Sequence, residues 1–538
     1  MKYTKRFLCV FSFLLVTTPL HISEIKAEEN SDFDFSFFGE DQTDDCLAEI
    51  NPQLAHHTSR FPKDVTLSTL TSLNIQNVLK TELYQRTHAP IRRNPIDLPI
   101  LQILSLSYDD QKTLMVTPFI STIWKQNYTD TSSSIDSYIN LKLQDVMEVL
   151  DANEFTTISM PEVLELFTPL KMQEHTAGFM FQGIATSDRM AYTFSTPIYY
   201  TLDNFYLTAD EQTRISNYPL FSQFNGDIID FARHHLTSDR LGLGDTLLTA
   251  EYLLRETYSS SQSIGATLTV PTAFAFKKGL FGHHFNLNAK PHALDLYSDL
   301  IDPYLEDVAN GSNANTATIQ ENAELFGLSA LDRLSTMLLE RNMGNNYHWA
   351  LGTIYRSTIH FNDYISLISK MNFEVKTPSV CKRFFLVEAT EADFNQFDWE
   401  DNAIQVNEKI DFLNMQFKNV TFPIMYYATV FPGVLFHSTS CLKRHMAPGR
   451  WEPSIGFDSW FHSAEHFLNI KAPDYQLARI NKDKARRTRA WSSSVWIGID
   501  KVALPPSNWS FYWKGYVSML NAGFGDSYGL SFTFEKTF

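Results

Sequence analysis

The sequence predicts an all-β protein, an antiparallel transmembrane β-barrel of about 12 strands with long, partly helical loops. Long runs alternate apolar and polar residues, aromatic residues make up 14% of the chain, and no segment beyond the N-terminus has 18 consecutive apolar residues. Strands of soluble proteins average about five or six residues, whereas a strand that crosses a bilayer needs about 9–11. Because these runs reach ten or more residues, they favour strands that span a membrane.

Composition narrows the possible functions. The chain has 538 residues, of which 20% are charged, with a formal net charge of -17 and a mean hydropathy of -0.20. A protein built from membrane-spanning helices would be plainly hydrophobic, and a nucleic-acid-binding protein needs a basic face. We therefore expect neither membrane-spanning helices nor a nucleic-acid partner.

The first 27 residues resemble a signal peptide. Lys2, Lys5 and Arg6 precede an apolar run over residues 7–16, and the small residue Ala27 stands before an acidic stretch. This order of charge, apolar run and small residue predicts export with removal of residues 1–27. A short anchor helix is the alternative, although the run is short for about 30 Å of hydrocarbon.

Cysteine content gives little information about disulfides. Cys9 lies in the predicted signal peptide, which leaves Cys46, Cys381 and Cys441. An odd number of cysteines gives no disulfide framework. Whether Cys381 and Cys441 form a bridge stays open.

The remaining chain divides into two regions. Residues 28–110 are mixed and loop-like, and their most apolar stretch, "NPIDLPILQILSLSYDD", could pack against the main body as a plug or cap. Residues 111–538 contain the alternating runs and form the predicted barrel. Apolar residues at three- and four-residue spacing predict helical insertions near 140–152, 319–342 and 404–417, within long connections.

The alternating runs follow one another with turn residues between them. Ser187-Asp188, "SSSQ" at 259–262 and Asn362-Asp363 each separate two such runs, which predicts three β-hairpins. The other runs are "KTLMVTPFISTIW", "FPIMYYATVFPGVLFHS", "WEPSIGFDSWFH", "SSVWIGIDKV", "WSFYWKGYVSML" and the terminal "SYGLSFTFEKTF". A secreted β-sandwich or solenoid would show the same alternation with its apolar residues inward. Export, strand length and aromatic residues near strand ends favour the membrane barrel, since only helices and closed barrels satisfy their backbone groups in lipid.

The polar faces of these runs carry the candidate lumen residues. In "YHWALGTIYRSTIHF" the apolar Trp349, Leu351, Tyr355 and Ile359 share one face, and Arg356 and His360 share the other. By the same alternation, the lumen-facing candidates are Arg356, His360, Asp458, Lys514 and Glu535. Charges of opposite sign across a wet lumen could select permeating solutes. Alternatively, they pair with one another and only solvate the interior.

The end of the chain resembles the last strand of Gram-negative outer-membrane β-barrel proteins. That strand carries a signal for the insertion machinery: a polar residue, any residue, glycine, any two residues, then two hydrophobic residues one position apart. Residues 527–534, "SYGLSFTF", fit this pattern, and the chain ends on an aromatic residue as members of the family do. Lys536 departs from it at a position that is usually apolar. The resemblance assigns the insertion signal to Gly529, Phe532, Phe534 and Phe538, and it implies an outer-membrane location with barrel-insertion machinery and lipid as partners.

One catalytic pattern occurs in the predicted barrel. His462-Ser463-Ala464-Glu465-His466 reads H-x-x-E-H, the order found in inverted zinc peptidases. On a helix the two histidines could share one zinc ion, whereas on a strand four steps of about 3.3 Å hold them about 13 Å apart. Because the preceding residues are strand-like, we predict no metal site, no cofactor and no catalytic residues. In "FHSTS", His437 and Ser438 are neighbours that point apart on a strand.

The sequence therefore predicts a porin-like channel for passive diffusion of small hydrophilic solutes. One alternative is a non-conducting barrel with a role in adhesion or envelope structure, because a small barrel can also be filled by side chains or loops. A membrane-embedded hydrolase is the third hypothesis. The sequence leaves the oligomeric state and the identity of the solute open.

Overall fold

The computed structural model describes the barrel and the segment that leads into it. The described residues are 87–88, 91–125, 171–206, 236–278, 335–339, 343–344, 347–397, 423–446, 450–501, 509–523 and 525–538, with single positions at 210, 213, 408 and 412. The predicted signal peptide 1–27, most of the region 28–110 up to residue 86, and the predicted helix 140–152 lie outside this part of the chain.

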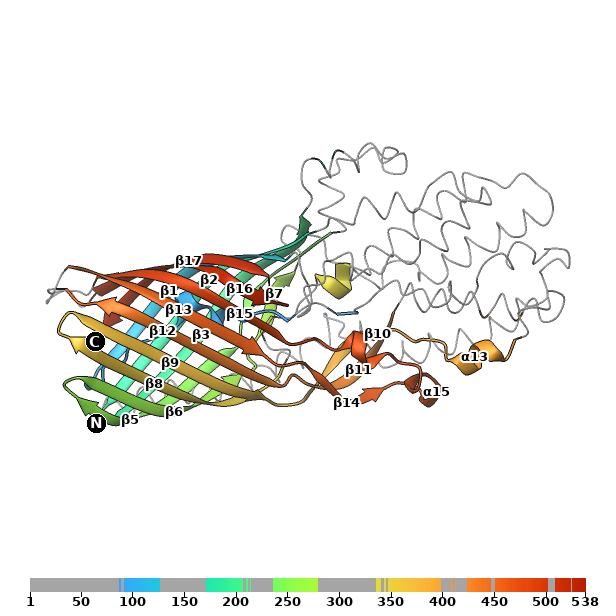
Figure 1. Cartoon of the computed structure of the whole chain (residues 1–538), viewed down its shortest axis with the longest axis horizontal. Helices are drawn as coiled ribbons and strands as arrows, with labels where there is room; N and C mark the ends of the chain where they lie inside the picture. Colours follow the sequence, from blue (N-terminus) through green and yellow to red (C-terminus); the bar gives the residue numbers. More distant parts are fainter. Residues whose placement is uncertain are drawn as a thin grey trace, which may run out of the picture. The chain divides into compact units, whose positions relative to one another are not determined.

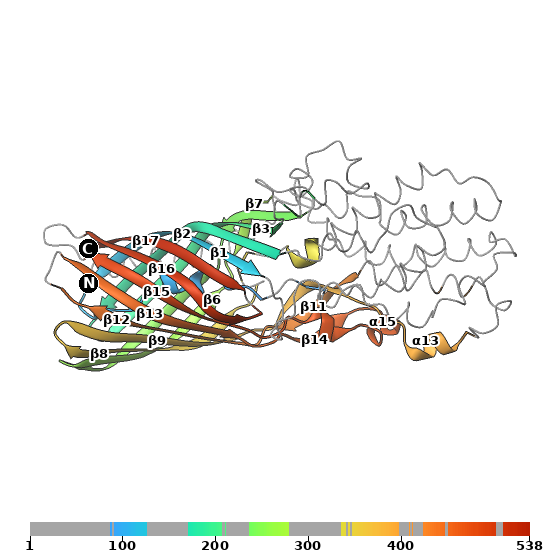
Figure 2. The same cartoon turned by 45° about the horizontal axis from the view of Figure 1, so that its top comes forward.

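Twelve antiparallel strands form a closed ring (Figures 1 and 2). They are β1 (Lys112–Lys125), β2 (Lys171–Ser187), β3 (Met190–Tyr206), β5 (Thr246–Thr257), β6 (Ser260–Val270), β8 (Ala350–Asn362), β9 (Ile365–Lys376), β12 (Val434–Arg444), β13 (Trp451–His462), β15 (Ala490–Lys501), β16 (Trp509–Ala522) and β17 (Asp526–Thr537). The last strand, β17, pairs with β1, and β1 pairs with β2, which closes the ring. The predicted antiparallel barrel and its strand number are confirmed, and the sandwich alternative is wrong because no sheet of the ring is left open.

One end of the ring carries short turns and is called the turn end here. Residues 188–189, 258–259 and 363–364 are the turns between β2 and β3, β5 and β6, and β8 and β9. The three predicted hairpins are thus confirmed with small shifts in their turns. The first strand also begins at this end, and the chain terminates there, where the Phe538 N–H donates to the carbonyl of Lys112 at 2.8 Å.

The opposite end carries strands that continue past the ring and is called the extension end. There β4 (Thr237–Leu243) pairs with β7 (Phe274–Lys278) and with β3. A separate three-stranded sheet, called the outer sheet, consists of β10 (Ser379–Phe385), β11 (Ile424–Phe431) and β14 (His466–Lys471). These three strands prolong β9, β12 and β13 in the same order.

The predicted single run at 422–438 is therefore two strands rather than one, which corrects the sequence analysis. Pro432 cannot donate to a strand ladder, and Gly433 has a φ of +90°, a backbone conformation that side chains disfavour. Together they end β11 and redirect the chain, so that only β12 belongs to the ring.

Helical structure is scarce in the described part of the chain. The helices described over their full length are η2 (Pro95–Asp97), η3 (Pro99–Leu101), α13 (Glu391–Asn395), α15 (Asp474–Leu477) and α16 (Lys482–Ala485). Of the predicted insertions 319–342 and 404–417, only residues 335–339, 408 and 412 are described, and all of these except residue 339 are helical, so both insertions stay predictions. Among the described residues, no helix is long and apolar enough to cross a membrane.

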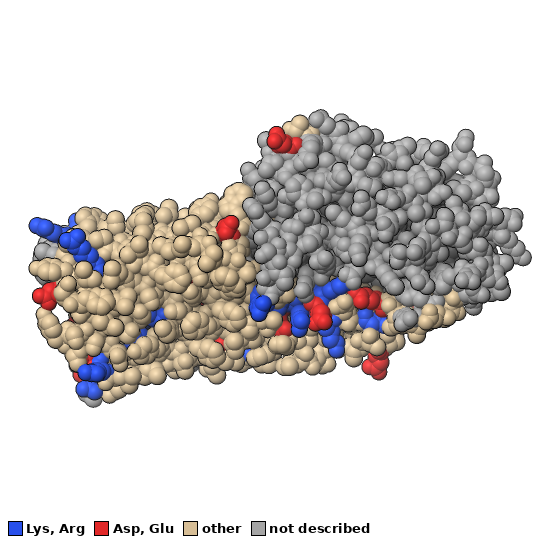
Figure 3. Space-filling view, viewed as in Figure 1, with Lys and Arg blue, Asp and Glu red and all other residues tan. Residues whose placement is uncertain are grey.

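The outward face of the ring is an apolar belt. Ile455, Phe457 and Ile497, on β13 and β15, are about half exposed, and few charged side chains lie between the two ends in Figure 3. From Trp451 to Phe461 the belt covers ten strand steps of about 3.3 Å, and a tilt of about 40° reduces that length to a height of about 25 Å. Exposed aromatic side chains stand near both rims: Tyr258, Tyr364, Trp451, Trp509 and Phe538 at the turn end, and Tyr347, Trp349 and Trp491 at the other.

Candidate functional site in the barrel lumen

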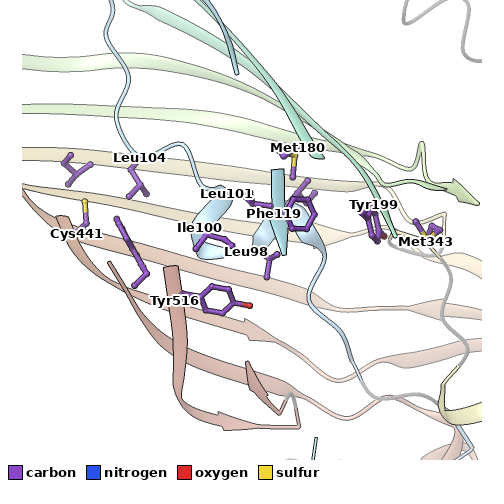
Figure 4. Close-up of a cluster of buried hydrophobic side chains, with 13 residues drawn as sticks. Leu98, Ile100, Leu101, Leu104, Phe119, Met180, Tyr199, Met343, Cys441 and Tyr516 are labelled. Carbon is purple, nitrogen blue, oxygen red and sulfur yellow. The ribbon is translucent and has the colours of Figure 1, made fainter. Parts of the chain in front are cut away.

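The interior of the barrel is occupied by residues 91–104, called the lumen segment here. Its apolar side chains Ile96, Leu98, Ile100, Leu101 and Leu104 form one buried cluster with inward side chains of seven strands. The strand side chains are Phe119, Met180, Tyr199, Ile368, Cys441, Trp496 and Tyr516, and Figure 4 shows Leu98, Ile100 and Leu101 among several of them. The lumen is therefore filled across its middle rather than open.

Inward polar side chains bind the backbone carbonyls of the lumen segment. Ser531 donates to the Ile100 carbonyl at 3.1 Å, and Gln182 donates to that of Leu101 at the same distance. Two short 3₁₀ turns and the extended residues around them leave several carbonyls without partners inside the segment, and a buried carbonyl needs a donor. These bonds fix the segment to β17 and β2.

Gln102 ties the segment to two lysines of the wall. Lys370 Nζ on β9 donates to the Gln102 side-chain oxygen at 2.8 Å, and Lys514 Nζ on β16 donates to its carbonyl at 3.2 Å. The Gln102 amide in turn donates to the Ile96 carbonyl at 2.6 Å, which stabilises the turns of the segment. A single residue thus couples the shape of the segment to a lysine on each of two strands of the ring, β9 and β16.

Arg93 makes the most deeply buried ion pair of the segment. Its Nη2 atom lies 2.6 Å from Asp458 Oδ2 on β13, and both side chains are almost completely inaccessible to solvent. His437 Nε2 and Thr439 Oγ1 on β12 lie within 2.6 Å of the other carboxylate oxygen, Oδ1. Burying two charges is costly unless they are paired and hydrogen-bonded, and this cluster meets both conditions.

Arg92 anchors the segment to a second pair of strands. Its Nε atom lies 3.1 Å from Glu174 on β2, and its Nη1 atom lies 3.2 Å from Asp203 on β3. Its guanidinium also donates to the carbonyl of Leu339 at 3.2 Å. Adjacent arginines therefore bind opposite regions of the wall.

The five residues predicted to face the lumen differ in their surroundings. Arg356 is buried, pairs with Glu251 at 2.8 Å and donates to the Ile103 carbonyl at 2.7 Å, and Asp458 pairs with Arg93. Lys514 binds Gln102 of the lumen segment, whereas Glu535 accepts a hydrogen bond from Tyr512 of the neighbouring strand. His360 is exposed at the turn end, with its ring 6.1 Å from that of His445. Three of the five residues therefore contact the lumen segment or its partner cluster directly.

Sequence reasoning missed Arg92, Arg93 and Gln102. They lie in a stretch whose sequence pattern is loop-like, and partners such as Asp458 and Lys370 are hundreds of residues away in the chain. The only local signal is the dipeptide Arg92-Arg93 at the start of an otherwise apolar stretch.

The four residues of the predicted insertion signal lie on β17 and at the chain end. Phe532, Phe534 and Phe538 are exposed on the outward face. Gly529 faces inward, where an added Cβ would come within 2.6 Å of the Tyr516 ring and of the Ile120 carbonyl. The glycine thus leaves room for Tyr516, whose hydroxyl lies 2.6 Å from Ser121 Oγ on β1. Lys536 lies about 5 Å from the ring centroids of Trp509 and Phe538, as a cation over an aromatic face.

The H-x-x-E-H residues have other partners. His462 ends β13, where its Nε2 atom lies 3.1 Å from Lys376 Nζ, and His466 begins β14. A lysine ammonium beside an imidazole opposes binding of a metal cation. Within the described ranges, no group of three or more His, Cys, Asp or Glu residues is placed to hold a metal ion.

Cys381 and Cys441 are both free thiols, so no disulfide joins this pair.

Glu465 belongs instead to a buried ion cluster at the extension end. It lies 3.1 Å from Arg383 on β10 and 3.5 Å from Arg487, and the Arg487 N–H donates to it at 3.3 Å. Burial alone would raise the pKa of the Glu465 carboxyl, but Arg383 and Arg487 outweigh burial and lower this pKa to about 2. The cluster fastens the outer sheet to the connection that follows β14.

Comparisons with known proteins do not assign the chain to a family. No family model matches the chain, and no curated protein matches it. Among solved structures, an outer membrane channel from Pseudomonas putida F1 matches with 10% identity and a TM-score of 0.39, covering 81% of this chain and 97% of the channel.

Two further solved structures are similar over most of the chain. The translocator domain of the autotransporter NalP from Neisseria meningitidis has 5% identity and a TM-score of 0.29, with 80% of this chain and 90% of that domain covered. The toluene transporter TbuX from Ralstonia pickettii has 8% identity and a TM-score of 0.28, with 85% and 97% covered. These values are too low to carry a functional argument, so the assignment of the fold rests on the closed strand pairing of this chain.

Proposed function

We propose that the protein is an outer-membrane channel whose lumen segment closes it in the state described above. The outward belt matches the hydrocarbon thickness that transmembrane barrels need, and the wall of the lumen carries polar and charged side chains. The observation that carries the proposal is the occupied lumen: a single stretch of 14 residues, 91–104, fills the middle and is held by side chains of the surrounding strands. Displacing it would leave a passage for small hydrophilic solutes, lined by polar and charged side chains together with the apolar side chains that contact the segment.

The membrane assignment is tested on the outward face. Replacing the half-exposed Ile497 at mid-belt with arginine is expected to destabilise the barrel in lipid by about 2–4 kcal/mol, because a charge would be buried in hydrocarbon. The matched control is Tyr258→Arg at the exposed turn, where the cost should be about 0–1 kcal/mol. Reversible unfolding by denaturant in lipid vesicles measures both. Equal effects of the two substitutions would contradict the membrane assignment.

Channel activity is tested by removing the closing element. Deletion of residues 28–104, with the signal sequence retained, is expected to give a steady ion current in planar lipid bilayers, because the lumen then holds only wall side chains and water. Deletion of residues 28–86 leaves the lumen segment in place and should conduct no more than the full chain. Heat-modifiable migration on gels verifies that each barrel is folded.

The buried ion pairs of Arg92 and Arg93 favour a second candidate, a barrel that never conducts. Such a barrel would have a role at the cell surface or in envelope structure, and the segment would be a permanent part of its core. If a variant without residues 28–104 folds and carries no current, the result would support the non-conducting barrel and contradict the channel proposal.

A hydrolase receives less support from the geometry. His437 is buried in the lumen and contacts Asp458, but its neighbour Ser438 lies on the opposite face of β12. A histidine cannot activate a serine that points away from it.

A further inference from the structure

The chain that contains the lumen segment runs along the whole barrel, and β2 shows its direction. This strand begins at the extension end and ends at the turn end. Its residues Glu174, Gln182 and Thr186 contact, in that order, Arg92, the Leu101 carbonyl and the Asp109 carbonyl. Twelve strand steps of about 3.3 Å separate Glu174 from Thr186, which is about 40 Å along the strand. The chain therefore passes from the extension end to the turn end inside the ring.

The chain just upstream of the lumen segment is fixed outside the ring. The Thr87 hydroxyl donates to the carbonyl of Phe384 on β10 at 2.6 Å, and the Thr87 N–H donates to the carbonyl of Lys484 on α16 at 3.2 Å. Both partners belong to structure beyond the ring at the extension end. Thr87 therefore marks the place where the chain enters the lumen.

The chain just downstream of the lumen segment is fixed at the turn end of the barrel. Thr186, next to the turn between β2 and β3, bonds with the backbone of Asp109 and Gln111. The first strand, β1, begins directly afterwards at Lys112 and pairs with both β17 and β2. Since Arg92 and the lumen segment contact inward side chains of the ring and Asp109 lies at its turn end, the chain between Thr87 and β1 passes through the lumen.

We propose that the barrel threads its own chain through the lumen, so that the chain upstream of Thr87, called the arm here, leaves the ring at the extension end. The lumen segment is then a tether as well as a closing element. Barrels of this class place short turns on the periplasmic side and longer connections outside, so the extension end, where the arm leaves the ring, would be the outer end of the barrel.

The test compares the side on which the arm is labelled with the sides of the two ends. Single-cysteine variants in a background without the native cysteines carry either Ser72→Cys or Asn77→Cys in the arm. Asn395→Cys on α13 reports the extension end, and Ser259→Cys in the exposed turn reports the turn end. Each variant is treated with a membrane-impermeant maleimide in intact cells and again after permeabilisation, and the ratio of the two labelling yields is measured.

The arm cysteines are expected to give the same ratio as Asn395→Cys and the opposite of Ser259→Cys. This comparison holds whichever end faces the medium, since the arm follows the extension end in both orientations. Arm cysteines that follow Ser259→Cys would overturn the proposal, and so would arm cysteines that label only after permeabilisation while Asn395→Cys labels in intact cells. Labelling measures sidedness and not current, so a failure here leaves the channel proposal to its own experiment.

Discussion

The substitution Arg93→Ala is expected to release the lumen segment and to give the full-length protein an ion current that the wild type lacks. Arg93 and Asp458 lie 2.6 Å apart and are nearly inaccessible to solvent. Removing one partner of a buried pair costs about 3–5 kcal/mol, because the other charge stays buried and unpaired. In the Arg93→Ala variant, the Asp458 carboxylate is buried and unpaired with Arg93 for as long as the lumen segment stays docked, that is, bound inside the lumen.

This free-energy cost applies only to the docked state, in which the lumen segment fills the barrel. Once the segment leaves, water enters the lumen and hydrates Asp458, so the released state carries no unpaired buried charge. A difference of about 3–5 kcal/mol corresponds to a rise of roughly 10²- to 10³-fold in the ratio of released to docked protein. Single-channel recording in planar bilayers would show this rise as more frequent opening events.

Three variants control this prediction. Arg93→Lys keeps the charge and should open less often than Arg93→Ala, whereas the exposed Arg189→Ala should behave as the wild type. The double variant Arg93→Ala/Asp458→Asn removes the unpaired charge and should restore part of the closure. If Arg93→Ala folds and stays as silent as the wild type, the pair does not hold the segment in place.

The ring itself is predictable from the sequence because its physical cause is local. A strand between lipid and a polar lumen must alternate at every second residue, so "SSVWIGIDKV" and "WSFYWKGYVSML" show their two faces without reference to any other strand. The same alternation places Arg356, Asp458 and Lys514 on the inward face. Their partners do not follow from it, because the ring decides which strands meet.

The lumen segment is hidden from the sequence for a physical reason. Its residues follow no strand or helix period, since their carbonyls bond to wall side chains rather than to a regular ladder. Arg93 and Asp458 are 365 residues apart in the chain. A stretch that is ordered only by distant partners reads as a loop, and its apolar residues suggest only that it packs somewhere.

The outer sheet is partly visible in the sequence. Pro432-Gly433 marks the boundary between β11 and β12, but the breaks after β9 and β13 carry weaker signals. Residues 463–465 separate β13 from β14 at the H-x-x-E-H pattern, and the Glu465 carboxylate there pairs with Arg383 and Arg487. The pattern that suggested a zinc site therefore has a structural role at a strand boundary.

Replacing Glu465 with glutamine is expected to loosen the outer sheet at neutral pH and to abolish its response to acid. The variant leaves Arg383 and Arg487 buried beside a neutral side chain, at a cost of about 3–5 kcal/mol. Hydrogen exchange of the β10, β11 and β14 amides, referenced to intrinsic exchange rates at each pH, measures the change. Glu388→Gln is the matched control, since its partner Lys484 lies 3.0 Å away but the carboxylate is 41% exposed, and exposed pairs contribute about 0–1 kcal/mol.

The acid response of the wild type follows from the sign of the pKa shift. Folding lowers the pKa of Glu465 from 4.5 to about 2, so the unfolded chain binds the proton more readily. The carboxylate therefore contributes its full stabilisation above pH 4.5 and loses it progressively as the pH falls towards 2, with a total of about 3 kcal/mol. Protection of the outer sheet should fall in that window in the wild type and in Glu388→Gln but stay flat in Glu465→Gln. A fall of equal size in Glu465→Gln would assign the acid response to other groups. Because Thr87 bonds to Phe384 of the same sheet, acid should also free the entry point of the lumen segment, and the wild type, silent at neutral pH, should begin to conduct over the same range.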